Sequence, residues 1–229
     1  MGPMLQKRHF QAAVTLDQHV YVIGGGYDRS SPASTTTEIL AAGSTTWQQG
    51  PPLPVEMFNG PCAVAISSTS FLVFYATEIR EFDASIAGPT SGQGWAKERK
   101  WPKLKTKRYM WPGCAKVGED KVVIAGGYDG QSVHQTTDIL DLTSRKLSKG
   151  GKMSTPKFFF HIITFNYNSD IITLALGGQE KDGDGPPIDI VERWNPETES
   201  WSTVETRLKE KRNGFGLVAA PKRIICPSK

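Results

Sequence analysis

An internal repeat of about 51 residues constrains the fold of this chain more than any other feature of its 229 residues. Three glycine pairs each follow a short apolar run: Gly25–Gly26, Gly126–Gly127 and Gly177–Gly178. The second glycines lie 101 and 51 residues apart, so the first interval spans two periods. One further copy is therefore expected near residue 76.

Basic residues and tryptophans keep the same period. Three arginines lie 100 and 104 residues apart, and a lysine fills one intervening position: Arg8, Arg108 and Arg212, with Lys157. Trp47 and Trp201 follow their glycine pairs by 21 and 23 residues. Self-similarity at a fixed period of this size is typical of repeat folds, including propellers.

Each unit reads as four short strands. The first strand is small and apolar, the second ends at the glycine pair, the third carries an acid, and the fourth contains the tryptophan. Four-stranded units of this length are the pattern of a β-propeller blade. The sequence predicts an all-β chain forming one domain over residues 1–229, with units at about 8–55, 56–107, 108–156 and 157–211 and a partial fifth at 212–229.

The units resemble the kelch family. The resemblance lies in the apolar run with Gly-Gly, the aromatic residue after it (Tyr27, Tyr128), and the turn WNPETESW that leads to Trp201. It covers the chain from about Arg8 to Cys226 and implies a kelch-type β-propeller with four full blades and a partial fifth. Kelch propellers usually carry more blades, so we expect an incomplete or open ring, a piece of a longer product, or pairing with a second chain. Unpaired blade edges would favour self-association.

The second unit departs from the pattern. Tyr75-Ala76 stands where the glycine pair is expected, and Glu78 follows almost at once. We therefore expect the loop after the second strand to be nearly absent, with the lost length returned in residues 84–94, before Trp95.

Motifs for chemistry are missing from the sequence. The glycine pairs match neither the phosphate-binding GxxxxGK[ST] loop nor the dinucleotide fingerprint GxGxxG. The histidines are scattered without metal-ligand spacing, and KDGDG (181–185) lacks the final glutamate of a calcium loop. We expect no enzyme activity, no cofactor and no metal. A propeller enzyme resembling the copper oxidases is the alternative of another class.

The charge and the cysteine content bear on the partners and the cellular compartment that we expect for this chain. The net charge of +4 is mild, and the basic run from Lys97 to Arg108 is interpreted as a solvated loop. Nucleic-acid binding with Trp101 as a stacking platform is its alternative. Three cysteines without CxxC spacing argue against a disulfide framework, and Cys62 and Cys114 are interpreted as small buried residues at matching positions of first strands. No secretion signal or membrane span is visible, which favours a cytoplasmic location, with the nucleus as a second possibility.

The kelch resemblance implies a binding face made by the loops after second strands and the loops entering first strands. The candidate partner-binding residues on these loops are Tyr27, Asp28, Arg29, Tyr128, Asp129, Gln131, His134, His9, Tyr109, Phe158 and Asn213. The glycine pairs and the tryptophans Trp47, Trp95 and Trp201 are predicted to be structural. In the family such a face implies a protein partner or a peptide degron, as in recruitment to cullin ubiquitin ligases, or association with actin.

Overall fold

The computed structural model describes residues 2–26, 35–54, 60–86, 94–96, 100–107, 110–182 and 185–219. Every regular element in these ranges is a β-strand. No helix in the described part of the chain is long and apolar enough to cross a membrane. The prediction of an all-β chain is therefore confirmed.

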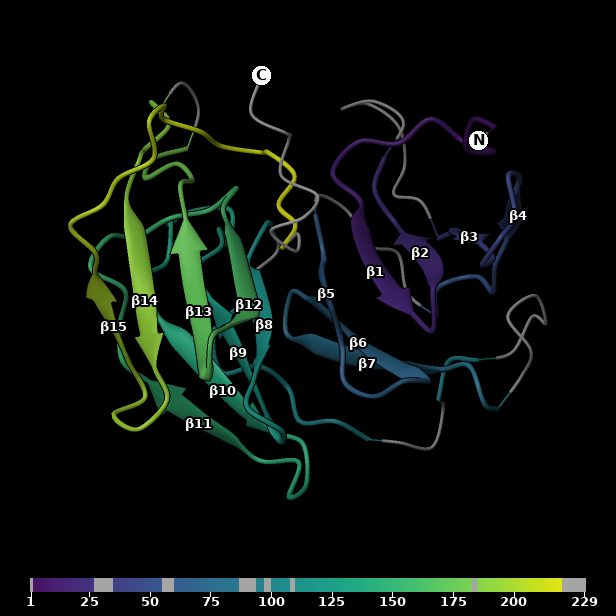
Figure 1. Cartoon of the computed structure of the whole chain (residues 1–229), viewed down its shortest axis with the longest axis horizontal. Helices are drawn as coiled ribbons and strands as arrows, with labels where there is room; N and C mark the ends of the chain where they lie inside the picture. The colour runs from purple at the N-terminus through teal and green to yellow at the C-terminus, as the bar shows by residue number, and fades with distance from the viewer. Residues whose placement is uncertain are drawn as a thin grey trace.

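The strands form four antiparallel sheets that follow one another along the chain (Figure 1). Sheet 1 contains β1 (Ala12–Leu16), β2 (His19–Ile23), β3 (Thr37–Leu40) and β4 (Trp47–Gln49). Sheet 2 contains β5 (Cys62–Ala65), β6 (Ser70–Tyr75) and β7 (Glu78–Asp83). Sheet 3 contains β8 (Gly113–Val117), β9 (Lys121–Ala125), β10 (Thr137–Asp141) and β11 (Leu147–Gly150). Sheet 4 contains β12 (His161–Tyr167), β13 (Asp170–Leu176), β14 (Val191–Asn195) and β15 (Ser200–Thr203).

Within each sheet the strands pair in chain order, as in a meander. Four strands per unit are confirmed for sheets 1, 3 and 4. The prediction is wrong for sheet 2 in the described residues, because its fourth strand is reduced to one bridge between Trp95 and Phe82. The predicted fifth unit forms no strand within residues 212–219, although Arg212 makes a bridge to Ile188.

The sheets pack face to face through their first strands and through three apolar clusters. The first strand β1 lies against β5, β5 against β8, and β8 against β12. In the cluster between sheets 1 and 2, the ring of Tyr21 lies 5.4 Å from those of Phe71 and Phe82. A second cluster joins sheets 2 and 3, and a third joins sheets 3 and 4. Because side chains alternate along a strand, each inner sheet supplies both of its faces to the core.

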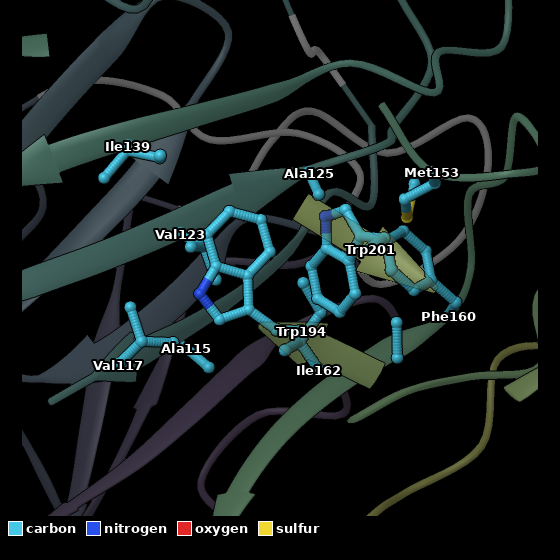
Figure 2. Close-up of a cluster of buried hydrophobic side chains, with 11 residues drawn as sticks. Ala115, Val117, Val123, Ala125, Ile139, Met153, Phe160, Ile162, Trp194 and Trp201 are labelled. Atoms are coloured by element: carbon cyan, nitrogen blue, oxygen red, sulfur yellow. The ribbon is translucent and has the colours of Figure 1, made fainter. Parts of the chain in front are cut away.

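Two tryptophans carry the third cluster, which Figure 2 shows. Trp194 and Trp201 lie on paired strands of sheet 4 with their rings 5.1 Å apart. Trp201 is 9% exposed and its indole donates a hydrogen bond of 2.9 Å to the Thr137 hydroxyl in sheet 3. Trp95 packs edge-on against Phe82 in the first cluster, whereas Trp47 on β4 is only half-buried.

The hydrogen bonds at the ends of the second strands show that the first glycine pair was assigned one residue too late in the sequence. The amide of Gly24 donates to the carbonyl of Thr36, as the amides of Gly126 and Gly177 do to the carbonyls that precede their own third strands. Both members of the pair have positive φ: 64° and 81° at Gly24 and Gly25, against 63° and 89° at Gly126 and Gly127. The pair is therefore Gly24–Gly25, and Gly26 corresponds to Tyr128. Three consecutive glycines hid this shift of one residue in the sequence.

The glycine pairs are needed because the next unit approaches them closely. The amide of Gly127 donates to the carbonyl of Lys157 at 2.9 Å, and a Cβ on Gly126 would overlap that same oxygen. The amide of Gly178 donates in the same way to the carbonyl of Arg212. Glycine supplies both the positive φ and the space at these positions.

The hairpin of sheet 2 agrees with the expected loss of its loop. Tyr75 pairs directly with Glu78, so only Ala76 and Thr77 turn the chain. Ala76 has a φ of 53°, which is the conformation that glycine has at the matching positions of the other sheets.

Buried ion pairs attach the entry segment of a unit to its third strand. Arg8 and Glu38 lie 2.9 Å apart with side chains 1% and 2% exposed, and Arg8 also donates to the carbonyl of Gly24. Lys157 and Glu192 form the same kind of pair, and neither side chain is exposed. Desolvation by burial lowers the pKa of Lys157 in spite of its carboxylate partner. Arg212 differs, because its side chain pairs with exposed Glu210.

Candidate functional site

Aromatic side chains gather where the chain enters the first strands. Three of them stand two residues before a first strand: Phe10, Trp111 and Phe159. Phe158 and Tyr128 continue the group through their ring contact. We call these five residues the aromatic face.

The rings of the aromatic face are in mutual contact. Trp111 stacks on Phe159 with ring centroids 3.7 Å apart, and Phe10 meets Trp111 edge-on at 4.8 Å. Phe158 links them to Tyr128, since its centroid lies 5.8 Å from Trp111 and 5.7 Å from Tyr128. Rings from three units are therefore in continuous contact. Phe158, which the sequence predicted to face a partner, is buried at 1% exposed, whereas the other four rings remain partly open to solvent.

The three entry residues have an unusual backbone. The φ angles are 59° at Phe10, 47° at Trp111 and 56° at Phe159. Positive φ is a genuine outlier for a bulky residue and costs free energy, whereas glycine adopts it freely. Glycine does occupy this position in two other units, as Gly60 (72°) and Gly214 (59°). The backbone alone would therefore accept glycine throughout, so the backbone conformation does not account for the three aromatic rings.

A cavity of about 480 Å³ lies where the four first strands begin. Phe10, Trp111 and Phe159 line it, together with the early residues of β1, β5, β8 and β12 and residues 214–217. The early residues of β1 and β5 contribute small side chains to its wall, as at Ala12, Ala13 and Ala63. A volume of this size can hold several side chains of a bound segment.

Tyr128 and Asp129 hold the loop that follows β9. A hydrogen bond between the Tyr128 hydroxyl and Asp182 raises the pKa of that tyrosine. Asp129 accepts hydrogen bonds from the amides of Gln131 and Ser132, at 2.8 and 2.7 Å. Desolvation by burial acts to raise the pKa of Asp129, but the hydrogen bonds from these amides and the interaction with the His134 ring lower it overall. The Asp129 carboxylate and the His134 ring lie 3.1 Å apart and close the loop, so part of their hydrogen-bonding capacity is satisfied within the loop.

The other predicted residues divide into two groups. His9 touches Phe10 with ring centroids 4.5 Å apart, and Asn213 donates a hydrogen bond of 2.6 Å to the side chain of Gln179, which itself bridges to Phe158. These residues therefore border the aromatic face. Tyr27, Asp28, Arg29 and Tyr109 lie outside the described residues.

Sequence reasoning missed Phe10, Trp111 and Phe159. Each follows a basic landmark by two or three residues, and that regular spacing was the available signal. Their positive φ, which singles them out, has no mark in the sequence.

The interpretation of the cysteines as separate buried residues is wrong. Cys62 on β5 and Cys114 on β8 form a disulfide whose Cα atoms are 6.0 Å apart. Both stand at matching positions of adjacent first strands, and the repeat packing brings those strands side by side. An odd number of cysteines and a separation of 52 residues concealed a pair that only the fold creates.

The indole of Trp101 is already engaged within the protein. It donates a hydrogen bond of 3.0 Å to Glu81, and the guanidinium of Arg145 lies 5.1 Å from its ring centroid. Nearby Lys103 pairs with Glu78 at 3.3 Å. These contacts weigh against Trp101 as a free platform for a nucleic-acid base.

Across the described ranges, no group of three or more His, Cys, Asp or Glu residues could hold a metal ion. No protein-family model matches the sequence, and none of the curated proteins shows significant similarity to it.

Proposed function

We propose that this chain is a non-catalytic recognition module of the kelch propeller type that binds a protein or peptide segment through the aromatic face. The observation that carries the proposal is the placement of three aromatic rings at positive φ around one cavity. A protein that accepts backbone strain at three equivalent positions, while using glycine at two others, gains something from the rings.

The chemistry of the face favours a polypeptide as its ligand. Aromatic residues are enriched at the centres of protein interfaces, where they exclude water around a few strong contacts. Polar groups border the rings on two sides, at His9 and at Asn213 with Gln179. A segment with one or two apolar side chains would fill the cavity entrance while its backbone met these polar groups.

The wider role follows from the kelch resemblance. Recruitment of a degron-bearing substrate to a cullin ubiquitin ligase is our first proposal, and association with actin is the second. A cytoplasmic or nuclear location would suit both. Self-association through open sheet edges is a further proposal, which light scattering across a concentration series would test.

A random peptide library selected on the chain tests the binding proposal. Selected peptides are titrated against the chain and against the Phe10→Gly and Phe159→Gly variants, which lose the ring but suit the positive φ. We expect each variant to weaken binding by at least about tenfold. Tyr167→Ala is the matched control, because this tyrosine is 62% exposed at the far end of β12. Equal affinity of all variants would refute the aromatic face as the binding surface.

A further inference from the structure

The Cys62–Cys114 disulfide lies in the wall of the cavity. Both residues line the cavity, with Cys62 half-buried and Cys114 7% exposed. The bond joins β5 of sheet 2 to β8 of sheet 3, so it is a covalent link between two sheets that also pack through an apolar cluster.

The segments that lead into the two cysteines also contact one another. The amide of Trp111 donates a hydrogen bond of 3.1 Å to the carbonyl of Gly60. The indole of Trp111 lies so close over Gly60 that a Cβ there would overlap the ring. Gly60 stands two residues before Cys62, and Trp111 stands three before Cys114.

Proline stiffens both connections. Pro61 lies between Gly60 and Cys62, and Pro112 directly follows Trp111. The ring of proline fixes φ, so each short connection has little freedom to absorb movement at the cysteine. The position of the disulfide is therefore transmitted to the Gly60–Trp111 contact.

We propose that Cys62 and Cys114 form a reversible thiol–disulfide switch that controls the position of Trp111. In the disulfide state the indole is held over Gly60 and stacked on Phe159. In the dithiol state β5 and β8 separate slightly, and Trp111 relaxes from its positive φ of 47°. The consequence for partner binding rests on the proposed function of the aromatic face, whereas the movement of Trp111 does not.

The chemistry is ordinary thiol–disulfide exchange. A low-molecular-weight thiol enters the cavity as its thiolate and attacks one sulfur, which forms a mixed disulfide and releases the other cysteine. A second small thiol then attacks the sulfur of the first within this mixed disulfide, which forms a small disulfide and releases the remaining cysteine as a thiolate. Overall, two small thiols become one disulfide while the cysteines gain two electrons and two protons. The corresponding small disulfide reverses both steps.

Sheet 2 is the element most able to respond. It has three strands, and the described part of its fourth is the single Trp95–Phe82 bridge. In the described residues it therefore has one strand fewer than its neighbours, so loss of a covalent link is expected to loosen it first.

Hydrogen exchange at the indole Nε1 of Trp111 tests the switch. This atom is buried and has no hydrogen-bond partner among the residues that the structure describes, and Trp201, whose indole donates to Thr137, is the internal control. The chain is labelled at tryptophan nitrogen, Trp111→Phe assigns the resonance, and Cys226→Ser removes the third thiol. Exchange is followed in glutathione disulfide and in reduced glutathione, with alkylation and mass spectrometry recording the state of each cysteine.

We expect reduction to make both cysteines alkylatable without denaturant and to accelerate exchange at Trp111 by at least about tenfold, with Trp201 unchanged. The Cys62→Ala/Cys114→Ala variant should match the reduced chain in either buffer. Equal exchange at Trp111 in both states, or cysteines that resist reduction in the folded chain, would overturn the proposal. A selected peptide titrated in both buffers is a separate measurement: if Trp111 moves but no peptide binds, the switch stands and the proposed function fails.

Discussion

The indole of Trp201 in sheet 4 donates a hydrogen bond to the hydroxyl of Thr137 in sheet 3, beside the apolar cluster that joins the two sheets. The two residues are 64 positions apart, and their contact joins the outer strand of one unit to the third strand of the unit before it. Trp201 is therefore tied to the preceding sheet both by apolar contact and by a hydrogen bond.

Truncation of Trp201 should therefore separate the two sheets. We expect Trp201→Ala to lower the free energy of unfolding by about 3–5 kcal/mol, because a large buried ring and its hydrogen bond are both lost. Trp47→Ala, at the matching but half-buried position of sheet 1, should cost about 1 kcal/mol or less. Urea unfolding followed by circular dichroism measures both, and equal losses would contradict the burial difference.

The entry position of β12 should prefer glycine to alanine. Both substitutions at Phe159 remove the same ring contacts, but alanine keeps the cost of the positive φ. We expect Phe159→Gly to be more stable than Phe159→Ala by about 1–2 kcal/mol. Thermal unfolding of the two variants compares them directly, and an alanine variant as stable as the glycine variant would argue against the strained backbone.

The glycine pair should tolerate no side chain. Gly126→Ala places a methyl group on the Lys157 carbonyl, so we expect a loss of at least about 3 kcal/mol. Gly118 has a similar φ of 66° but open space around it, and Gly118→Ala should cost only about 1 kcal/mol. A similar cost for both substitutions in chemical denaturation would show that the close approach has no energetic weight.

Acid should weaken the fold through His161. This ring is exposed along the cavity wall, yet desolvation by the surrounding protein lowers its pKa, and only the carbonyl of Phe215 acts in the opposite sense. Below pH 6.5, the ordinary pKa of histidine, His161 is therefore protonated in the unfolded chain but stays neutral in the folded chain until the pH reaches its lowered pKa. The free energy of unfolding should fall as the pH drops from 6.5 to the lowered pKa, and it should fall less in a His161→Asn variant. A variant with an unchanged pH profile would exclude this histidine as the cause.

Most of the sheet structure could be predicted from the sequence, because each repeat unit corresponds to one sheet. A fixed period located all four sheets, and the missing glycines at Tyr75-Ala76 correctly indicated a short hairpin. The first glycine pair was misplaced by one residue, since the run Gly24-Gly25-Gly26 contains two possible pairs.

The candidate site was less predictable, because it depends on contacts between units. Tyr128 and His9 were predicted from their loops, but the stacking of Trp111 on Phe159 joins residues 48 positions apart, in the units of sheets 3 and 4. The disulfide depends in the same way on two strands becoming neighbours. A period tells which residues are equivalent, whereas only packing tells which of them meet.

The two-residue turn at Ala76–Thr77 also makes the units around the aromatic face unequal. Sheets 3 and 4 have longer connections after their second strands, whereas sheet 2 has a two-residue turn there and Gly60 at the position that holds an aromatic ring in sheets 1, 3 and 4. A set of identical units would offer an elongated ligand several equivalent orientations. Under the proposed function, the irregular second unit would remove that equivalence, so that a bound segment would be held in a single polarity.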